Sequence, residues 1–131
     1  MIQVGSILFV SDKSGVSLCE CIKVLSSGKK RIAFLSDVIL VSVKRLNLLR
    51  FSRLKDRQKK KFSKGTLHRA LIIRTKVYYC RFPGIFVRFD ENSVVLVNKK
   101  VVPVSNRIYG PVLMELCVRY PSVGCVSRHI I

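Results

Sequence analysis

Short apolar runs separated by turn-forming residues recur along this chain of 131 residues. The runs are rich in Val, Ile and Phe, which favour strands, whereas the breaks, such as Ser26-Ser27-Gly28, hold residues that favour turns. Five or six short strands at this spacing are typical of a small closed barrel, so we predict an all-β dominated fold. The predicted strands are Val4 to Val10, Leu18 to Leu25, Asp37 to Lys44, Leu67 to Lys76, Ile85 to Phe89 and Val94 to Asn98.

The run from Ile85 to Phe89 shows the alternation of a half-buried strand most clearly. Ile85, Val87 and Phe89 share one parity, so they are expected to face the core. Arg88 has the other parity, and we therefore expect its side chain to face solvent.

A helical pattern interrupts the strands near the C-terminus. Pro111 follows Gly110 and precedes VLMELCV, in which Leu113, Leu116 and Cys117 fall on one helical face. Because proline is favoured in the first turn of a helix, we predict a short helix that starts at Pro111 and caps the barrel. We expect a single domain over residues 1–131, with a C-terminal helical region over about residues 111–131.

The net charge of +18 constrains the partner of this fold. Since 49% of the residues are hydrophobic, the composition excludes a disordered basic tail, and 25 Lys and Arg must lie on a small folded surface. Such a surface favours a polyanion as the binding partner. Nucleic acid is the leading candidate, and an anionic membrane is the second. No apolar run approaches the roughly 18 to 20 residues of a transmembrane helix, so we expect no membrane partner.

The charge is densest in RLKDRQKKKFSKG, the segment from Arg53 to Gly65. Eleven Lys or Arg lie between Lys44 and Arg69, and Asp56 is the one acidic residue among them. A charge run usually marks a solvated face, but so one-sided an excess favours contacts with phosphates. Because the run interrupts two predicted strands, we expect a basic ribbon or loop over about residues 46–64, with a tip that is unstructured in the free protein.

Other Lys and Arg recur singly in and around the predicted strands, where we expect them to point outward. Together with the basic run they form the candidate RNA-binding set. Its members are Lys23, Lys44, Arg45, Arg50, Arg53, Lys55, Arg57, Lys59, Lys60, Lys61, Lys64, Arg69, Arg74, Lys76, Arg81, Arg88 and Arg107.

Aromatic residues are interleaved with charge near the middle of the chain. Tyr78, Tyr79 and Phe82 flank Arg81, an arrangement that allows stacking on unpaired bases. Alternation also requires one face of a strand to be buried, so core packing of about half of these rings is an equal alternative.

The five cysteines show no zinc-binding pattern. None stands in a CxxC spacing, and the two histidines, His68 and His129, are too few to complete paired ligand sites. Cys19 and Cys21 share one face of a predicted strand, which indicates small apolar fillers in a reducing compartment. We therefore predict no metal and no cofactor.

Catalysis is not supported by the acidic residues. The seven Asp and Glu are scattered, and the adjacent pair Asp90 and Glu91 points apart in extended backbone. His68 lies in a basic strand, where a phosphate or surface contact is favoured over a general base. We predict that the protein is not an enzyme.

Several blocks in order resemble a known family. They are MIQ at the N-terminus, DKSG at Asp12 to Gly15, CIKVL at Cys21 to Leu25, KGTLHRALIIRTK at Lys64 to Lys76, VRFDENSVVLVNKK at Val87 to Lys100 and NRIYGPVLMEL at Asn106 to Leu116. The order and spacing of these blocks are similar to those of the universal large-subunit ribosomal protein number fourteen family.

The resemblance implies a five-stranded β-barrel with a projecting β-ribbon and short C-terminal helical turns. It also implies a structural constituent of the large ribosomal subunit, which binds large-subunit rRNA at the subunit interface and takes part in an intersubunit bridge during translation. Neighbouring large-subunit proteins, small-subunit rRNA and a ribosome-silencing factor are the partners it implies. The best candidates for RNA contacts under this resemblance are Lys23, Lys44, Lys64, Arg74, Lys76, Arg88 and Arg107.

The chain departs from the family pattern in four places. Two turns differ, because the usual Gly-containing turns are replaced by Phe34 to Asp37 and by Pro83-Gly84. The tail from Arg119 to Ile131 fits the family pattern only loosely. The link from Leu46 to Ser63 is longer and more basic than in bacterial relatives. With five cysteines and no Lys or Arg before Lys13 to form a targeting signal, this drift indicates a mitochondrially encoded copy. A plastid or bacterial cytoplasmic copy is the alternative source.

A second function class shares the same charge and strands. A free-standing small-barrel RNA-binding protein, acting as a chaperone or regulator, would also be basic and β-rich. The two classes differ in behaviour, because only the ribosomal protein should be confined to large subunits.

Overall fold

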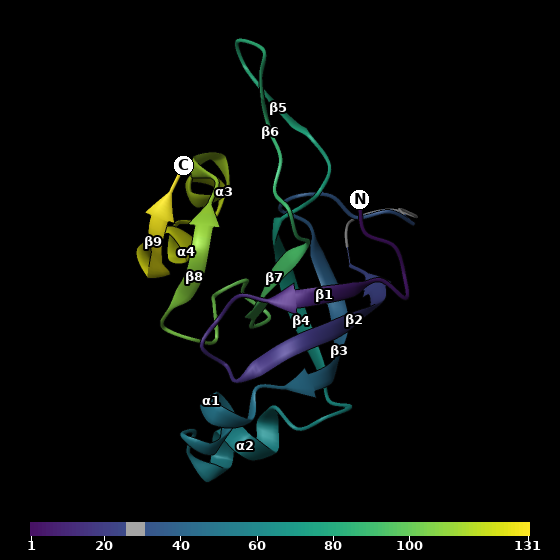
Figure 1. Cartoon of the computed structure of the whole chain (residues 1–131), viewed down its shortest axis with the longest axis vertical. Coiled ribbons are helices and arrows are strands. Elements are labelled where there is room, and N and C mark those ends of the chain that lie inside the picture. Colours follow the sequence, from purple (N-terminus) through teal and green to yellow (C-terminus); the bar gives the residue numbers. More distant parts are fainter. Residues whose placement is uncertain (26–30) are drawn as a thin grey trace.

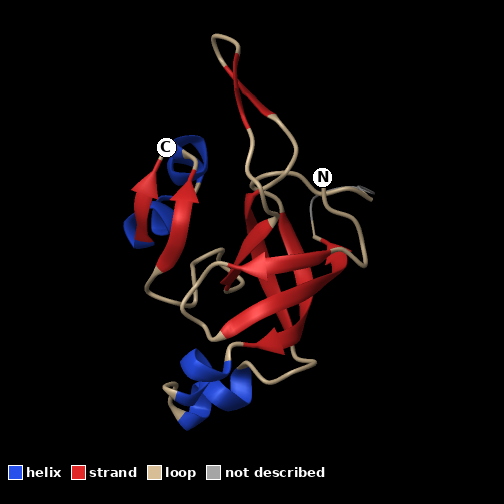
Figure 2. Ribbon diagram, viewed as in Figure 1, coloured by secondary structure: helices blue, strands red, loops and turns tan. Residues whose placement is uncertain are grey.

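The computed structural model describes residues 1–25 and 31–131, so the predicted turn at Ser26-Ser27-Gly28 lies outside the described residues. Its centre is a closed five-stranded barrel with the strand order β1-β2-β3-β4-β7 (Figures 1 and 2). Neighbouring strands are antiparallel except β1 and β7, whose parallel pairing closes the barrel. The predicted small closed barrel is thus confirmed. Its strands are β1 (Ile7–Val10), β2 (Val16–Val24), β3 (Val38–Leu46), β4 (Leu67–Arg74) and β7 (Ser93–Val97).

Alternate residues of each strand fill the barrel interior. Leu8, Val41 and Leu96 are fully buried there, as period-two alternation requires. Cys19 and Cys21 are also fully buried and form no disulfide, which confirms their prediction as small apolar fillers. Small side chains suit a five-stranded barrel because its interior is narrow.

The outer faces of β4 and β7 are buried as well. Leu71 and Ile73 on β4, with Val95 on β7, pack against a second apolar cluster that includes Leu113 and Leu116. A strand that is covered on both faces has a continuous apolar sequence, which explains the uninterrupted runs ALII in β4 and VVLV in β7.

The second cluster belongs to a C-terminal unit formed by β8 (Ile108–Val112), α3 (Met114–Arg119), α4 (Pro121–Val126) and β9 (Ser127–Ile130). The expected C-terminal helices are present, but the prediction that Pro111 starts one was wrong. Pro111 lies in β8 opposite His129 of β9, and Gly110 has a φ of 81°. Pairing with β9 keeps this segment extended, so the helix begins only at Met114.

The basic link between β3 and β4 forms two short helices, α1 (Leu48–Ser52) and α2 (Asp56–Lys61), and the prediction of a ribbon with an unstructured tip was wrong. Asn47 caps α1 by accepting a hydrogen bond from the backbone N–H of Arg50. In α2, Asp56 lies in the first turn and three lysines lie in the last, which complements the helix dipole. We call residues 47–62 the helical insert.

A projecting ribbon does exist, but at the opposite end of the molecule from the helical insert (Figure 1). It consists of β5 (Tyr79–Arg81) and β6 (Ile85–Val87), paired antiparallel. Assigning Ile85 to a core-facing position was therefore wrong, because its side chain is 57% exposed on a two-stranded ribbon that has no core of its own. Arg88, just beyond β6, is exposed as predicted.

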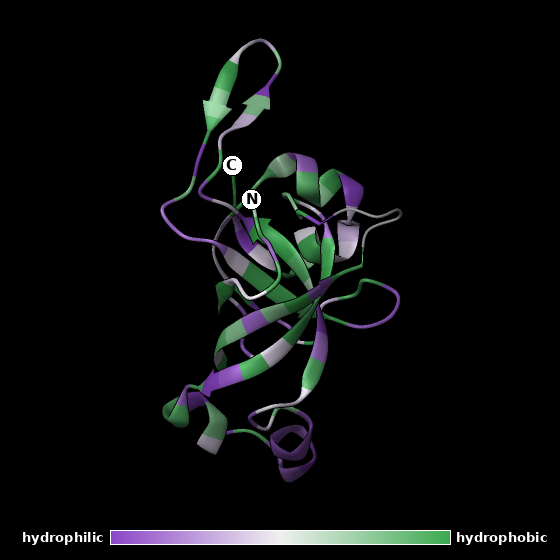
Figure 3. Ribbon diagram, turned by 90° about the vertical axis from the view of Figure 1, so that its right-hand side faces the viewer, coloured by the Kyte–Doolittle hydropathy of each residue, from purple (hydrophilic) through white to green (hydrophobic). Residues whose placement is uncertain are grey.

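The aromatic residues in and beside the ribbon differ in burial. Tyr79 packs partly against the second apolar cluster. Tyr78 and Phe82 are exposed, Phe82 to 98%, and Figure 3 shows apolar colour on part of the ribbon, interrupted by polar colour, and polar colour over α2.

Candidate nucleic-acid interface

The helical insert is held firmly against one end of the barrel. Gly15, at a φ of 85°, approaches it so closely that a Cβ would lie 3.0 Å from Cδ1 of Leu54 and 3.3 Å from Cα of Phe51. The backbone N–H of Asn47 donates to the carbonyl of Gly15 at 2.9 Å, and Phe62 is only 3% exposed. The insert therefore presents its charges from a fixed position.

His68 joins β4 to the end of the insert. Its Nε2 lies 2.9 Å from the carbonyl oxygen of Lys61, and its ring centroid lies 5.1 Å from that of Phe62. Burial lowers the pKa of His68, which favours a neutral ring that donates to this carbonyl. The predicted phosphate or surface contact is thus replaced by a structural contact within the protein.

Most charges of the insert are free of acidic partners. Asp56 pairs with Lys59, at 3.6 Å, and this is the one ion pair found inside the insert. The predicted residues that remain exposed on the insert are Arg50, Arg53, Lys55, Arg57, Lys60 and Lys61. The helical insert is strongly positive because Asp56 is its single carboxylate.

Two arginines from distant parts of the chain converge on one ring. The Cζ atom of Arg50, on α1, lies 4.4 Å from the Tyr109 ring centroid, and that of Arg107 lies 5.3 Å from the same centroid. Neither guanidinium forms an ion pair within residues 1–25 and 31–131, and Nε of Arg107 is buried without a hydrogen-bond partner there. Two cations held together without a counter-ion favour a bound anion such as a phosphate.

Tyr109 was absent from the predicted site residues. The available signal was its position two residues after Arg107, which places both side chains on the same face of an extended segment. The proximity of Arg50 has no sequence signal, because it depends on the docking of α1.

Predicted residues on the barrel strands line its outer surface. Lys23 on β2 and Arg69 on β4 both lie opposite Leu40 of β3, so the two charges flank one apolar residue. Arg45, Lys64 and Lys76 are also exposed, whereas Lys44 pairs with Glu20.

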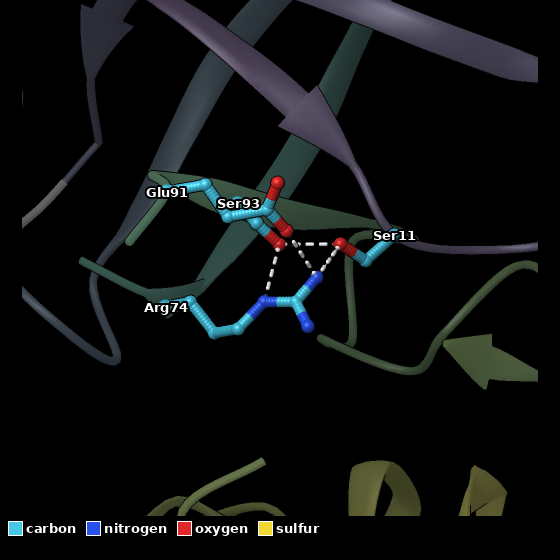
Figure 4. A network of polar contacts seen from close by, with 4 residues as sticks. All are labelled: Ser11, Arg74, Glu91 and Ser93. Atoms are coloured by element: carbon cyan, nitrogen blue, oxygen red, sulfur yellow. Dashed lines mark hydrogen bonds and ion pairs between the residues drawn. The ribbon is translucent and has the colours of Figure 1, made fainter. Parts of the chain in front are cut away.

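Arg74 does not point into solvent, and that prediction was wrong. Its side chain is 6% exposed, and it contacts Ser11, Glu91 and Ser93 (Figure 4). A register shift after Ile72 aligns Arg74 with Ser93, on the barrel face that the C-terminal unit covers. Burial lowers the pKa of Arg74, and the Glu91 carboxylate, 2.9 Å from Nη2, opposes that shift.

Arg81 anchors the ribbon to the C-terminal unit. Its guanidinium binds both carboxylate oxygens of Glu115 on α3 and donates to the carbonyl of Ile131 at 2.9 Å. The hydrogen bonds from Arg81 lower the pKa of Glu115. Arg81 is therefore already neutralised, while Arg88 lies over Tyr78 at 5.1 Å and remains exposed.

Metal and membrane sites are not seen among the residues that the structure describes. No group of three or more His, Cys, Asp or Glu there could hold a metal ion. No helix in that part of the chain has the length and apolar character needed to cross a membrane.

Comparison with known families gives a match that covers the chain. The whole chain, residues 1–131, matches the family model described as Ribosomal protein L14p/L23e. The match extends over the barrel, the helical insert, the ribbon and the C-terminal unit.

Proposed function

Since the chain belongs to the ribosomal protein L14p/L23e family, whose members are proteins of the large ribosomal subunit, we propose that it binds large-subunit rRNA as a structural constituent of that subunit. The observation that carries this proposal is the pair of guanidinium groups of Arg50 and Arg107 at Tyr109, with no carboxylate partner among the described residues. Phosphates of an RNA backbone supply the missing negative charge.

The strength of binding should depend steeply on salt. Each phosphate neutralised by Lys or Arg releases counterions, so ten contacts give a log-log slope of roughly −7 to −9. The proposed RNA contacts are the exposed candidates together with the partly buried Arg107, while Arg74 and Arg81 serve mainly to hold the protein together. That division is supported by the burial of Arg74 and by the ion pair of Arg81 with Glu115.

The two ends of the molecule support different partners. The helical insert is basic, whereas the ribbon exposes Phe82, Ile85 and Phe86. We propose rRNA contacts for the basic end, at the subunit interface, and a contact with a neighbouring large-subunit protein for the apolar ribbon. We also propose a bridge to small-subunit rRNA and a contact with a ribosome-silencing factor.

The proposed location is a mitochondrial ribosome, with plastid or bacterial ribosomes as alternatives.

A free-standing RNA-binding protein remains the second candidate, because the basic surface alone suits either role. Sedimentation separates the two. We expect the native protein to co-sediment with large subunits through moderate salt and to be released only by concentrated salt. Recovery wholly in the soluble fraction at moderate salt would contradict the ribosomal proposal, and fractionation of organelles in the same experiment tests the location.

A further inference from the structure

A pocket separates the helical insert from the loops at the barrel end. Its volume is about 510 Å³, within the range of small-ligand sites. Insert residues such as Arg53, Lys55 and Lys61 line one side, and Lys13 and Asn106 line the other. We call this space the insert pocket.

The insert pocket is strongly cationic. Lys13, Arg53, Lys55 and Lys61 line it, and none of these four forms an ion pair in the described part of the chain. No carboxylate lines the pocket. Four like charges around one concave space create a positive potential that an anionic group would relieve.

Charge alone does not describe the lining. Leu54, Phe62 and Val104 give it an apolar part, and the amides of Gln58 and Asn106 offer both donors and acceptors. A phosphate by itself would contact the cationic side chains and would leave the apolar and amide groups without a contact. A nucleotide uses all three kinds of group, because it joins a phosphate to a flat base with apolar faces and a polar edge.

We infer that the insert pocket holds a single unpaired nucleotide of the RNA partner, with its phosphate among the Lys and Arg side chains and its base toward Leu54 and Val104. This inference rests on the proposed binding of RNA. A paired helix offers phosphates but keeps its bases stacked, so it would leave the apolar part of the pocket unfilled. An acidic peptide would satisfy the cations but would likewise leave that part empty.

Filling the pocket without a change of charge tests the inference. The probes are a short RNA hairpin with one bulged nucleotide and the same hairpin without the bulge, titrated with the full chain by fluorescence anisotropy. We expect the unaltered protein to prefer the bulged hairpin by about tenfold, because the extra base buries apolar area against Leu54 and Val104. Asn106→Trp, at an exposed lining position, should abolish that preference, whereas Asn98→Trp, at an exposed position in another turn and outside the lining, should retain it.

Charge variants provide a second test that does not depend on the fit of a tryptophan. Arg53→Gln with Lys55→Gln removes two lining charges, and Arg57→Gln with Lys60→Gln removes two exposed insert charges outside the lining. Both pairs should reduce the salt dependence of binding, but only the first should abolish the preference for the bulge. Thermal unfolding of each variant checks that the fold is intact.

The outcomes separate this inference from the proposed function. Equal binding of both hairpins by the unaltered protein would overturn the nucleotide pocket and leave rRNA binding standing, as would equal loss of the preference in both tryptophan variants. Polyglutamate provides a test for a general anion site. If it competes with RNA, and if Asn106→Trp weakens polyglutamate binding as much as it weakens RNA binding, the pocket is a general anion site instead. Failure to bind either hairpin, together with absence from large subunits, would overturn both proposals.

Discussion

The guanidinium of Arg74 occupies the space where a side chain on Gly110 would have to lie. A Cβ built on Gly110 would overlap Nη1 of Arg74, and Gly110 has a φ of 81°, which disfavours other residues. The two residues belong to β4 and β8, so the backbone of Gly110 lies directly against a charged group at the junction of the barrel with the C-terminal unit. Such a buried charge is tolerated because Glu91 pairs with it and Ser93 accepts a hydrogen bond from it.

Gly110→Ala should therefore destabilise the protein for two separable reasons. The left-handed backbone alone costs about 1–2 kcal/mol for a residue with a Cβ, and the overlap with Arg74 adds to that cost. Urea denaturation should show the full loss in the native background and only the backbone part in an Arg74→Ala background, as in a double-mutant cycle. An equal loss in both backgrounds would show that the two residues do not interact.

The cysteines should differ sharply in reactivity. Burial raises the pKa of Cys19 to about 12, and Cys21 is equally inaccessible to solvent, so neither thiolate is available near neutral pH. Cys80 and Cys125 are exposed. Iodoacetamide at pH 8 followed by peptide mass spectrometry should label the exposed pair first and the barrel pair only in urea. Labelling of Cys19 at the rate of Cys80 without denaturant would contradict the burial of β2.

Acid should weaken the attachment of the helical insert through His68. Because burial lowers the pKa of His68, the folded protein holds the ring neutral. As the pH falls below the ordinary value of about 6.5, the unfolded chain binds a proton before the folded one does, so stability is lost down to the folded pKa. Above 6.5 this contribution is fully present.

His68→Gln separates that effect from other titrations, because a glutamine amide can still donate to the carbonyl of Lys61. Free energies of unfolding in urea at pH 8, 7, 6 and 5 should show the native protein losing stability relative to the variant on acidification. A constant difference between the two proteins across this range would rule out the proposed role of His68.

The ribbon should be mobilised by Glu115→Gln. This change removes the acceptor charge for Arg81 and loosens the hold of α3 on β5. Since the pKa of Glu115 is lowered by Arg81, the native ion pair should be present above the ordinary pKa and lost only as the pH falls through the lower folded value. Hydrogen exchange should become faster at Arg81 and Gly84 in the variant, with β2 amides unchanged as the internal control.

In the barrel, the local sequence pattern and the tertiary packing agree. The barrel strands follow from alternation, and the runs ALII and VVLV carry the added information that β4 and β7 are covered on both faces. At Pro111 the local preference for a helix start is outweighed by pairing with β9. In the insert the dense charge predicts an unstructured tip, whereas Arg, Gln and Lys favour helices and Asn47 provides a cap.

The candidate site was predictable as a set of charges but not as an arrangement. Nothing in the spacing of Arg50 and Arg107 indicates that they share Tyr109, because the contact depends on how α1 packs against Gly15. Burial of Arg74 also depends on the C-terminal unit, whose strand pairing the sequence did not reveal.

Arg50 should contribute more to RNA binding than an equally charged neighbour. Arg50 is held over Tyr109, whereas Arg57 is exposed on α2 without an ion-pair partner among the described residues. A side chain already ordered in the free protein loses less conformational entropy on binding, by about 0.5–1.5 kcal/mol. Arg50→Gln and Arg57→Gln should each reduce the salt slope by about 1 if both contact phosphates, but Arg50→Gln should lose several-fold more affinity.

Tyr109→Leu isolates the contribution of the ring in this comparison, because it removes no charge. We expect it to weaken RNA binding by several-fold at constant salt while the salt slope stays the same, since the number of phosphate contacts is unchanged. Titration of a large-subunit rRNA fragment at several salt concentrations measures both quantities. If Arg50→Gln and Arg57→Gln were equivalent and Tyr109→Leu had no effect, the convergence on Tyr109 would be a feature of the fold without a role in RNA binding.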